Sequence, residues 1–203
     1  MASVWLEVDG RNYKFQLVKV KIKNQTYSDL FSLKNNKTLF ETIQDKKYRK
    51  LAADTGKRYS NYMNWRIGDF LLEQKYNDVF YKRFLNSSGD LNYCHFTMEE
   101  PRLSKLRGLY AFKAEAEVKY IGRCLDTFSR RINQGYGRID PKNCFIDGQP
   151  VNCRINNLVL SHISSFELFL LPHPGNPSEI SDLEKKLIAK YKPEWNKQHK
   201  QGY

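Results

Sequence analysis

Residues 108–124 read GLYAFKAEAEVKYIGRC, two short strand-like runs on either side of a polar KAEAE segment. Side chains alternate between the two faces of a strand, so Tyr110 shares a face with Gly108 and Tyr120 shares a face with Gly122. If the runs pair as neighbouring strands, both phenols can lie on one side of a sheet. Tyrosine is also a favourable strand residue, so each tyrosine taken singly fits an ordinary core position.

The chain from residue 106 onward predicts a small α+β module. Strands are expected at 108–113 and 118–122, then a short helix from Asp126 to about Asn133. The stretch GYGRIDPKNCFIDGQPVNCRINN follows as irregular structure, FELFLLP as a buried strand, and SEISDLEKKLIAKYKPEWN as a helix ending before Pro193. This order predicts a mixed α/β fold with a short antiparallel sheet flanked by helices.

Residues 1–105 are expected to form a separate N-terminal region, and residues 106–203 the module. VWLEVDGRNYKFQLVKVKI alternates around an Asp-Gly turn and predicts a β-hairpin. KTLFETIQDKKYRKLAA and NWRIGDFLLEQKYNDVFYKRFL each predict one long helix, the second ended by NSSGD. The chain shows no internal repeat and no low-complexity linker.

The formal net charge is +12 and is spread over both halves of the chain. Such a field attracts polyanions, chiefly nucleic acid, although a basic protein without such a partner is the alternative. No run of about 18 apolar residues occurs, and the start resembles no secretory signal. The four cysteines form no CxxC pair, which argues against a zinc site and for free thiols. We therefore expect a cytoplasmic protein with no membrane partner.

Glu184 lies among the apolar positions of the last expected helix. It is four residues after Ile180 and three before Leu187, on the inward stripe of that helix. A carboxylate there costs free energy unless it is paired or bound to a metal. Two readings remain open, because Ser181 and Glu184 also fit the two ends of a capping box, and Glu179 could equally mark the first turn.

Arg131 presents a similar case in DTFSRRIN. Phe128, Arg131 and Ile132 share one helix face, whereas Arg130 is turned away from it. Arg131 is therefore expected to point toward the core or cleft as a permanently charged fork suited to phosphate. The alternative is a salt bridge to Glu184 or to another acid.

These residues together resemble the signatures of the GIY-YIG nucleases. GLY at 108–110 resembles the first signature, and YIG at 120–122 the second. FSRRI fits the helix that carries the family's arginine, Glu184 matches its metal-binding glutamate, and KPEWN matches its later asparagine at Asn196. The resemblance covers roughly residues 106–198, and its connecting stretch resembles compact phage endonucleases and Type II restriction endonucleases.

The resemblance implies hydrolysis of DNA phosphodiesters with Mg²⁺ or Mn²⁺ bound by Glu184. Tyr110 would act as general base, Tyr120 would hydrogen-bond the phosphate or a water, and Arg131 would stabilise the transition state. Asn196 would hold the active-site helix or touch the DNA backbone. In parts of the family a histidine follows the arginine by four residues, but that position here is Gly135. The next residue, Tyr136, would orient the nucleophile or the phosphate.

DNA contacts are expected from the irregular stretch, although Asn and Gly there could simply build turns. The candidate residues are Arg138, Lys142, Asn152, Arg154, Asn156 and Asn157. Residues 1–105 would recognise DNA or mediate oligomerisation. Cleavage of both strands at a short site usually needs two active sites, so a homodimer or larger assembly on double-stranded DNA is expected.

Four functions remain open on the sequence. The favoured one is a Mg²⁺-dependent, sequence-specific Type II restriction endonuclease in a bacterial or phage-infected cell. The second is a phage- or repair-type nicking endonuclease of loose specificity, and the third a non-catalytic DNA-binding module. The fourth, a nuclease with a histidine-bound metal at His162, lacks the paired histidines that such a site needs.

Overall fold

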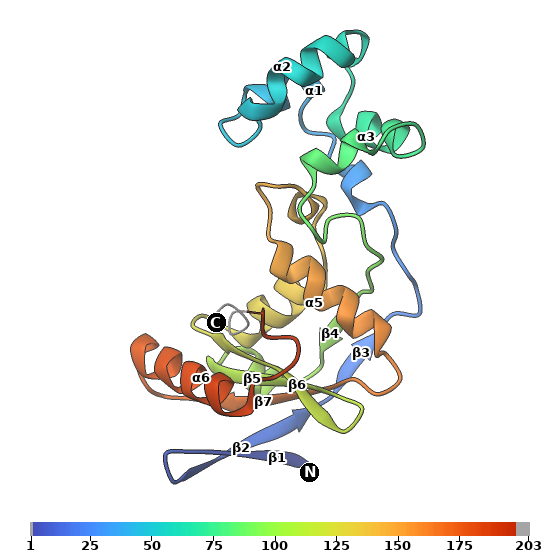
Figure 1. The fold of residues 1–203 in the computed structure, drawn as a ribbon. Coiled ribbons are helices and arrows are strands. Elements are labelled where there is room, and N and C mark those ends of the chain that lie inside the picture. The colour runs from blue at the N-terminus through green and yellow to red at the C-terminus, as the bar shows by residue number, and fades with distance from the viewer. Residues whose placement is uncertain (1, 198–203) are drawn as a thin grey trace. The chain divides into compact units, whose positions relative to one another are not determined.

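The computed structural model describes residues 2–197 and divides the chain into two compact units (Figure 1). Unit 1 consists of Met1–Lys23, His95–Arg138 and Leu158–Tyr203, and unit 2 of Asn24–Cys94 and Ile139–Asn157. The expected boundary between residues 105 and 106 is therefore wrong. The N-terminal hairpin pairs with a strand near the C-terminus, and the middle of the chain forms the second unit.

Unit 1 is built on an antiparallel five-stranded sheet with the strand order β1-β2-β7-β5-β6. Its strands are β1 (Ser3–Val8), β2 (Arg11–Val18), β5 (Gly108–Ala114), β6 (Glu117–Cys124) and β7 (Glu167–Pro172). The expected hairpin is confirmed, and Asp9 and Gly10 both have positive φ, as a two-residue turn between twisted strands requires. A second, two-stranded sheet pairs β3 (Val20–Ile22) with β4 (Phe96–Met98).

Helix α6 (Pro177–Tyr191) packs against one face of the five-stranded sheet. Leu109, Ala111 and Ile121 from the sheet meet Ile180 and Leu187 of the helix in one buried cluster. Strand alternation turns the neighbouring tyrosines to the opposite face. There they face a π-helical segment, Arg130–Tyr136, and the short helix α4 (Pro101–Ser104) precedes β5. The predicted mixed α/β fold with an antiparallel sheet flanked by helices is confirmed.

Unit 2 is largely helical, with its own aromatic core. It contains α1 (Leu39–Gln44), α2 (Arg49–Arg58), α3 (Ile67–Lys75) and the first part of α5 (Pro150–Ser161). Short 3₁₀ turns lie at Leu30–Leu33, Ser60–Tyr62, Val79–Phe84 and Pro141–Cys144. Fully buried rings fill the centre, among them those of Phe31, Tyr48, Phe70, Phe84 and Phe145.

Three expectations about regular structure are wrong. Each of the two long helices predicted in the first half is two shorter elements, with breaks between Gln44 and Arg49 and after Lys75. At the second break the Asp78 side chain accepts a hydrogen bond from the backbone N–H of Phe80 at 2.9 Å, which starts a new turn. The stretch predicted to be irregular contains α5. None of the helices in residues 2–197 is long and apolar enough to cross a bilayer.

Candidate active site

The two strands that carry the signatures, β5 and β6, pair side by side. Tyr110 of β5 is opposite Gly122 of β6, and Phe112 is opposite Tyr120. Gly108 begins β5 with φ 148°, and a Cβ there would lie 2.1 Å from the carbonyl oxygen of Leu171. A side chain at residue 108 would therefore push β5 away from β7. The expected placement of both phenols on one face is confirmed.

The helix that carries Arg131 continues beyond its predicted end as a π-helical segment, Arg130–Tyr136. Its wide turn shows in the bond from the N–H of Gly137 to the carbonyl of Ile132, five residues earlier, at 2.6 Å. In such a turn the residue five positions after Arg131 lies on the same face as Arg131. Tyr136 therefore occupies the place that a residue four positions on would take in an α-helix.

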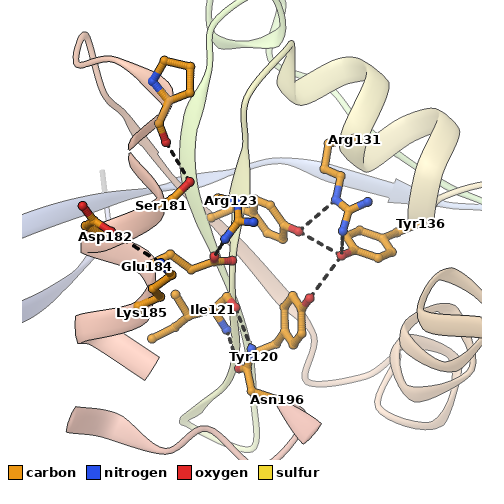
Figure 2. Close-up of polar contacts among 12 residues, drawn as sticks. Tyr120, Ile121, Arg123, Arg131, Tyr136, Ser181, Asp182, Glu184, Lys185 and Asn196 are labelled. Carbon is orange, nitrogen blue, oxygen red and sulfur yellow. Dashed lines mark hydrogen bonds and ion pairs between the residues drawn. The ribbon is translucent and has the colours of Figure 1, made fainter. Parts of the chain in front are cut away.

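Arg131 and three tyrosines form one hydrogen-bonded cluster (Figure 2). The Arg131 Nε donates to Tyr110 Oη at 3.1 Å, and Nη2 donates to Tyr136 Oη at 2.6 Å. Tyr136 Oη lies 2.9 Å from Tyr110 Oη and 3.2 Å from Tyr120 Oη. The guanidinium also lies over the Tyr136 ring, 4.5 Å from its centroid. The structure thus brings together four of the predicted catalytic residues.

Burial differs among the three tyrosines. Tyr110 and Tyr136 are fully buried, whereas Tyr120 is 8% exposed. A buried phenol needs a hydrogen-bond partner, and the Tyr136 oxygen lies within hydrogen-bond distance of both other hydroxyls. In each of these two contacts either hydroxyl can be the donor.

Burial sets the protonation of this cluster. Loss of solvent raises the pKa of Tyr110, the neighbouring Tyr120 raises it further, and Arg131 opposes the shift without cancelling it. Burial likewise raises the pKa of Tyr136. Burial lowers the pKa of Arg131, but Tyr110 and Tyr136 more than offset this, and the pKa is raised. At neutral pH the cluster therefore holds one cation and neutral buried phenols.

The positive charge of Arg131 has no carboxylate partner within residues 2–197. Its contacts are with the hydroxyls of Tyr110 and Tyr136, and with the Tyr136 ring. The salt bridge considered for it is absent from this part of the chain, and Glu184 pairs with another arginine. Neighbouring Arg130, by contrast, is exposed and pairs with Asp126 at 2.8 Å. Arg131 is held in place by neutral groups, so its charge is available to an anion.

Glu184 lies on α6 and does not cap that helix. Asn176 is the N-cap and forms a capping box with Glu179, whereas Ser181 Oγ donates to the carbonyl of Pro177. The capping alternative for Ser181 and Glu184 is therefore wrong, and Glu179 marks the first turn. Glu184 instead forms an ion pair with Arg123, and its side chain is 13% exposed (Figure 2).

Arg123 was missed in the sequence, although it directly follows the second signature. Strand alternation puts Arg123 on the α6 face of β6, opposite to the face of Tyr120 and Gly122. Glu184 and the tyrosine cluster therefore lie on opposite faces of an outer strand. The available signal was strand alternation, which places Arg123 on the same face as apolar Ile121, where a charge needs a partner.

The single carboxylate of Glu184 suits a hydrated Mg²⁺. Within residues 2–197 no group of three or more His, Cys, Asp or Glu side chains could enclose a metal. Mg²⁺ commonly uses one or two carboxylates, keeps several waters and takes phosphate oxygens for the rest. A single partly exposed carboxylate fits that chemistry once Arg123 moves off it.

His162 binds the carbonyl of Leu158 through Nδ1 at 2.8 Å and packs against Trp195.

Asn196 fastens the segment after α6 to β6. Its Oδ1 accepts from the N–H of Ile121 at 2.9 Å, and its Nδ2 donates to the Ile121 carbonyl at 2.8 Å. The adjacent N–H of Trp195 donates to the carbonyl of Lys119 at 2.8 Å. Both amide atoms of Asn196 are engaged next to Tyr120. These bonds hold the segment after α6 against β6, and the two expected roles of Asn196, holding the active-site helix or touching the DNA backbone, stay predictions.

The residues expected to contact DNA fall into two groups. Arg138 and Lys142 are exposed, and Arg154 and Asn157 are partly buried. Asn156 is fully buried and holds Cys94, accepting from its N–H at 2.9 Å and donating to its carbonyl at 2.8 Å. Asn152 is 4% exposed and binds Gln149. The expectation of DNA contact is wrong for these two, because α5 turns both inward.

In comparisons with known proteins, the chain matches no protein-family model, no curated protein and no solved structure. The GIY-YIG resemblance therefore rests on the motifs and on the cluster described above.

Proposed function

We propose that this chain is a Mg²⁺-dependent DNA endonuclease of the GIY-YIG type, and specifically a Type II restriction endonuclease. The observation that carries the proposal is the Arg131 guanidinium, held by tyrosine hydroxyls and lacking a carboxylate partner in the described chain. A half-buried cation arranged in this way is poised for an anionic ligand. The resemblance of the signatures supplies the identity of that ligand, a DNA phosphodiester.

Arg131 would stabilise the charge that develops on the phosphate. Its Nε and Nη2 are fixed by Tyr110 and Tyr136, which orients the remaining donors of the planar fork. Preoriented donors need little rearrangement as the pentacovalent phosphate forms. Tyr110 and Tyr136 thus have a positioning role toward Arg131 in addition to any role in proton transfer, and Tyr120 contacts Arg131 only through Tyr136.

Glu184 would hold the metal ion, which supplies positive charge to the leaving oxygen and to the phosphate. The carboxylate lies on the α6 face of β6 and Arg131 on the other. Since β6 is an outer strand of the sheet, a phosphate lying over its rim beside Gly122 could be reached from both faces. Arg123 would leave Glu184 as the metal binds, and its charge would then be free for the phosphate.

Tyr110 is the proposed general base, as the resemblance implies. Its raised pKa means that it carries its own proton at neutral pH. A neutral phenol can accept a proton from water if it passes its own proton on at the same time. The contacts of Tyr110 with Tyr136 and of Tyr136 with Tyr120 would provide such a route. Each phenol would pass on its own proton as it accepts one, and Tyr120, the more exposed end, would release its proton to solvent.

The test is cleavage of unmethylated phage and plasmid DNA with Mg²⁺ or with chelator, comparing wild type with Glu184→Ala. The matched control is Asp182→Asn, an exposed acid of the same helix that pairs with Lys185. Discrete fragments that require Mg²⁺ and Glu184 are expected, with the control fully active. A Mg²⁺-dependent smear or nicks would replace the restriction enzyme by a nuclease of loose specificity. Binding without any cleavage would overturn the catalytic assignment.

A further inference from the structure

Five exposed basic residues lie in the turn after α1 and on α2, elements that Figure 1 labels. We call them the basic surface. All five are exposed, and within residues 2–197 none of them forms an ion pair; they are Lys46, Lys47, Arg49, Lys50 and Lys57.

The buried residues of α2 and of the turn before it keep the basic side chains on the solvent-exposed side. Tyr48 and Thr55 are fully buried and Leu51 is 8% exposed, at the spacing of one helix face. The Tyr48 hydroxyl donates to Asp147 at 2.5 Å, which anchors the start of α2. The basic residues occupy the positions between these anchors, so the packing that builds the core also fixes the direction of the charges.

Nearby acids are already committed to other cations. Asp45 pairs with Lys37 at 2.8 Å, and Asp54 pairs with Arg83 at 2.8 Å. Asp78 pairs with Arg58, the remaining basic residue of α2, at 3.6 Å. Within residues 2–197, the nearby acids therefore form their ion pairs with cations outside the basic surface.

The positions of these charges also make the N-terminal end of α2 less stable. Arg49 and Lys50 occupy the first turn of α2, which contains no acidic residue, and Tyr48 provides no side-chain cap. Cations at a helix N-terminus repel its positive dipole end, and adjacent cations repel one another. An anion bound at this surface would relieve both repulsions.

We propose that the basic surface binds the phosphodiester backbone of the DNA substrate, independently of base sequence. This inference rests on the proposed function, because the substrate it names is the substrate of the nuclease. Clustered, unpaired cations complement the evenly spaced negative charge of a duplex and release its counterions on binding. Phosphate contacts of this kind position a protein on DNA, and base contacts elsewhere specify the sequence.

The experiment measures binding of wild type and two triple variants to a fluorescent DNA duplex in chelator, over a series of salt concentrations. K46Q/K47Q/K50Q removes three charges of the basic surface. The control, K19Q/K186Q/K190Q, removes three lysines that are paired with Glu99, Asp9 and Glu7. All these lysines are exposed, so unchanged melting midpoints will show that both variants fold.

The basic-surface variant should bind roughly 10- to 100-fold more weakly near physiological salt, with a log–log salt slope lower by about two to three units. The control should remain close to wild type. Equal losses in both variants, or no loss in either, would overturn the basic surface as a DNA site while leaving the nuclease proposal standing. Failure of the wild type itself to bind DNA would overturn both. Stronger binding to anionic vesicles than to DNA would also exclude the proposed partner.

Discussion

The phenol of Tyr110 lies where a side chain of Gly122 would be. A Cβ built at residue 122 would be 2.4 Å from Tyr110 Oη and 2.5 Å from its Cζ. The glycine of the second signature thus makes room for the tyrosine of the first, directly across the strand pair. The position of the Tyr110 ring therefore requires a glycine at residue 122.

Gly122→Ala should therefore displace Tyr110. We expect a loss of stability of about 1–3 kcal/mol, as for other overpacked sites, together with loss of DNA cleavage. Urea denaturation and a cleavage assay measure the two effects. Tyr110→Ala should itself cost about 3–5 kcal/mol, because it empties a buried site. In that background Gly122→Ala should cost less than it does alone, since the clashing ring is gone. Additive losses in the double variant would contradict the proposed clash.

Tyr110→Phe should separate catalysis from binding. The ring and its packing remain, but the hydroxyl that accepts from Arg131 and contacts Tyr136 is lost. Cleavage should fall roughly 10²- to 10⁴-fold, the range for loss of a general base, with DNA affinity nearly unchanged. Tyr76→Phe, at a residue 77% exposed in unit 2, is the control. Full activity of Tyr110→Phe would remove Tyr110 from the mechanism.

Arg131→Lys keeps the charge but not the planar fork. Lysine cannot contact both Tyr110 and Tyr136 and still present oriented donors. We expect single-turnover cleavage to fall about 10²- to 10³-fold, as for loss of preorganised transition-state donors. Arg130→Lys, one residue earlier and exposed, should cleave at the wild-type rate. If both variants behave alike, the geometry of Arg131 has no special role.

Arg123→Gln should strengthen metal binding in the absence of DNA. The variant removes the cation that occupies Glu184, so Mn²⁺ no longer competes with it. A partly exposed ion pair contributes up to about 1 kcal/mol, which corresponds to an affinity gain of about fivefold or less. Titration followed by electron paramagnetic resonance measures Mn²⁺ binding directly. Glu184→Ala should abolish the binding, and an unchanged or weaker affinity in Arg123→Gln would argue against competition.

The tyrosine cluster should make the fold sensitive to alkali. Burial raises the pKa values of Tyr110 and Tyr136 above the unfolded value of about 10. The unfolded chain therefore loses these protons first, and their contribution to stability is complete below about pH 10 and declines above it. Each group lowers the free energy of unfolding by up to about 1.4 kcal/mol per pH unit there.

Urea titrations from about pH 8 to pH 11 test this dependence. Tyr110→Phe/Tyr136→Phe should lose less stability between about pH 10 and pH 11 than wild type. Tyr76→Phe should follow the wild-type curve, because Tyr76 is 77% exposed. An unchanged alkaline slope in the double variant would show that the cluster does not titrate with unfolding.

Local sequence pattern predicted much of the sheet face that carries the tyrosine cluster. Alternation placed Tyr110 and Tyr120 on one side of the sheet, and helical spacing separated Arg131 from Arg130, as the structure confirms. These relationships hold over a few residues, where strand and helix geometry decide them. The position of Tyr136 required a π-helical turn, which helical periodicity alone does not reveal.

Pairing between strands far apart in the chain was harder to predict from the sequence. Nothing in the local pattern of β2 indicates that it pairs with β7, about 150 residues later, and the wrong domain boundary followed from this. The ion pair of Arg123 with Glu184 likewise depends on how α6 crosses the sheet. Asn156 was misjudged because Asn is common in turns, whereas here its amide binds the backbone of Cys94. Asn77 and Asp78 were a recognisable signal for a break in the second long helix that we had predicted.

The contacts of Asn196 and Trp195 with β6 have a consequence for self-association. β6 ends the five-stranded sheet, and an outer strand offers open backbone groups to any other extended chain. The segment after α6 occupies those groups at Lys119 and Ile121. Asn196 and Trp195 thereby keep these groups from pairing with a strand of a second molecule. A chain shortened before residue 195 should therefore aggregate more readily than the full chain, which light scattering measures.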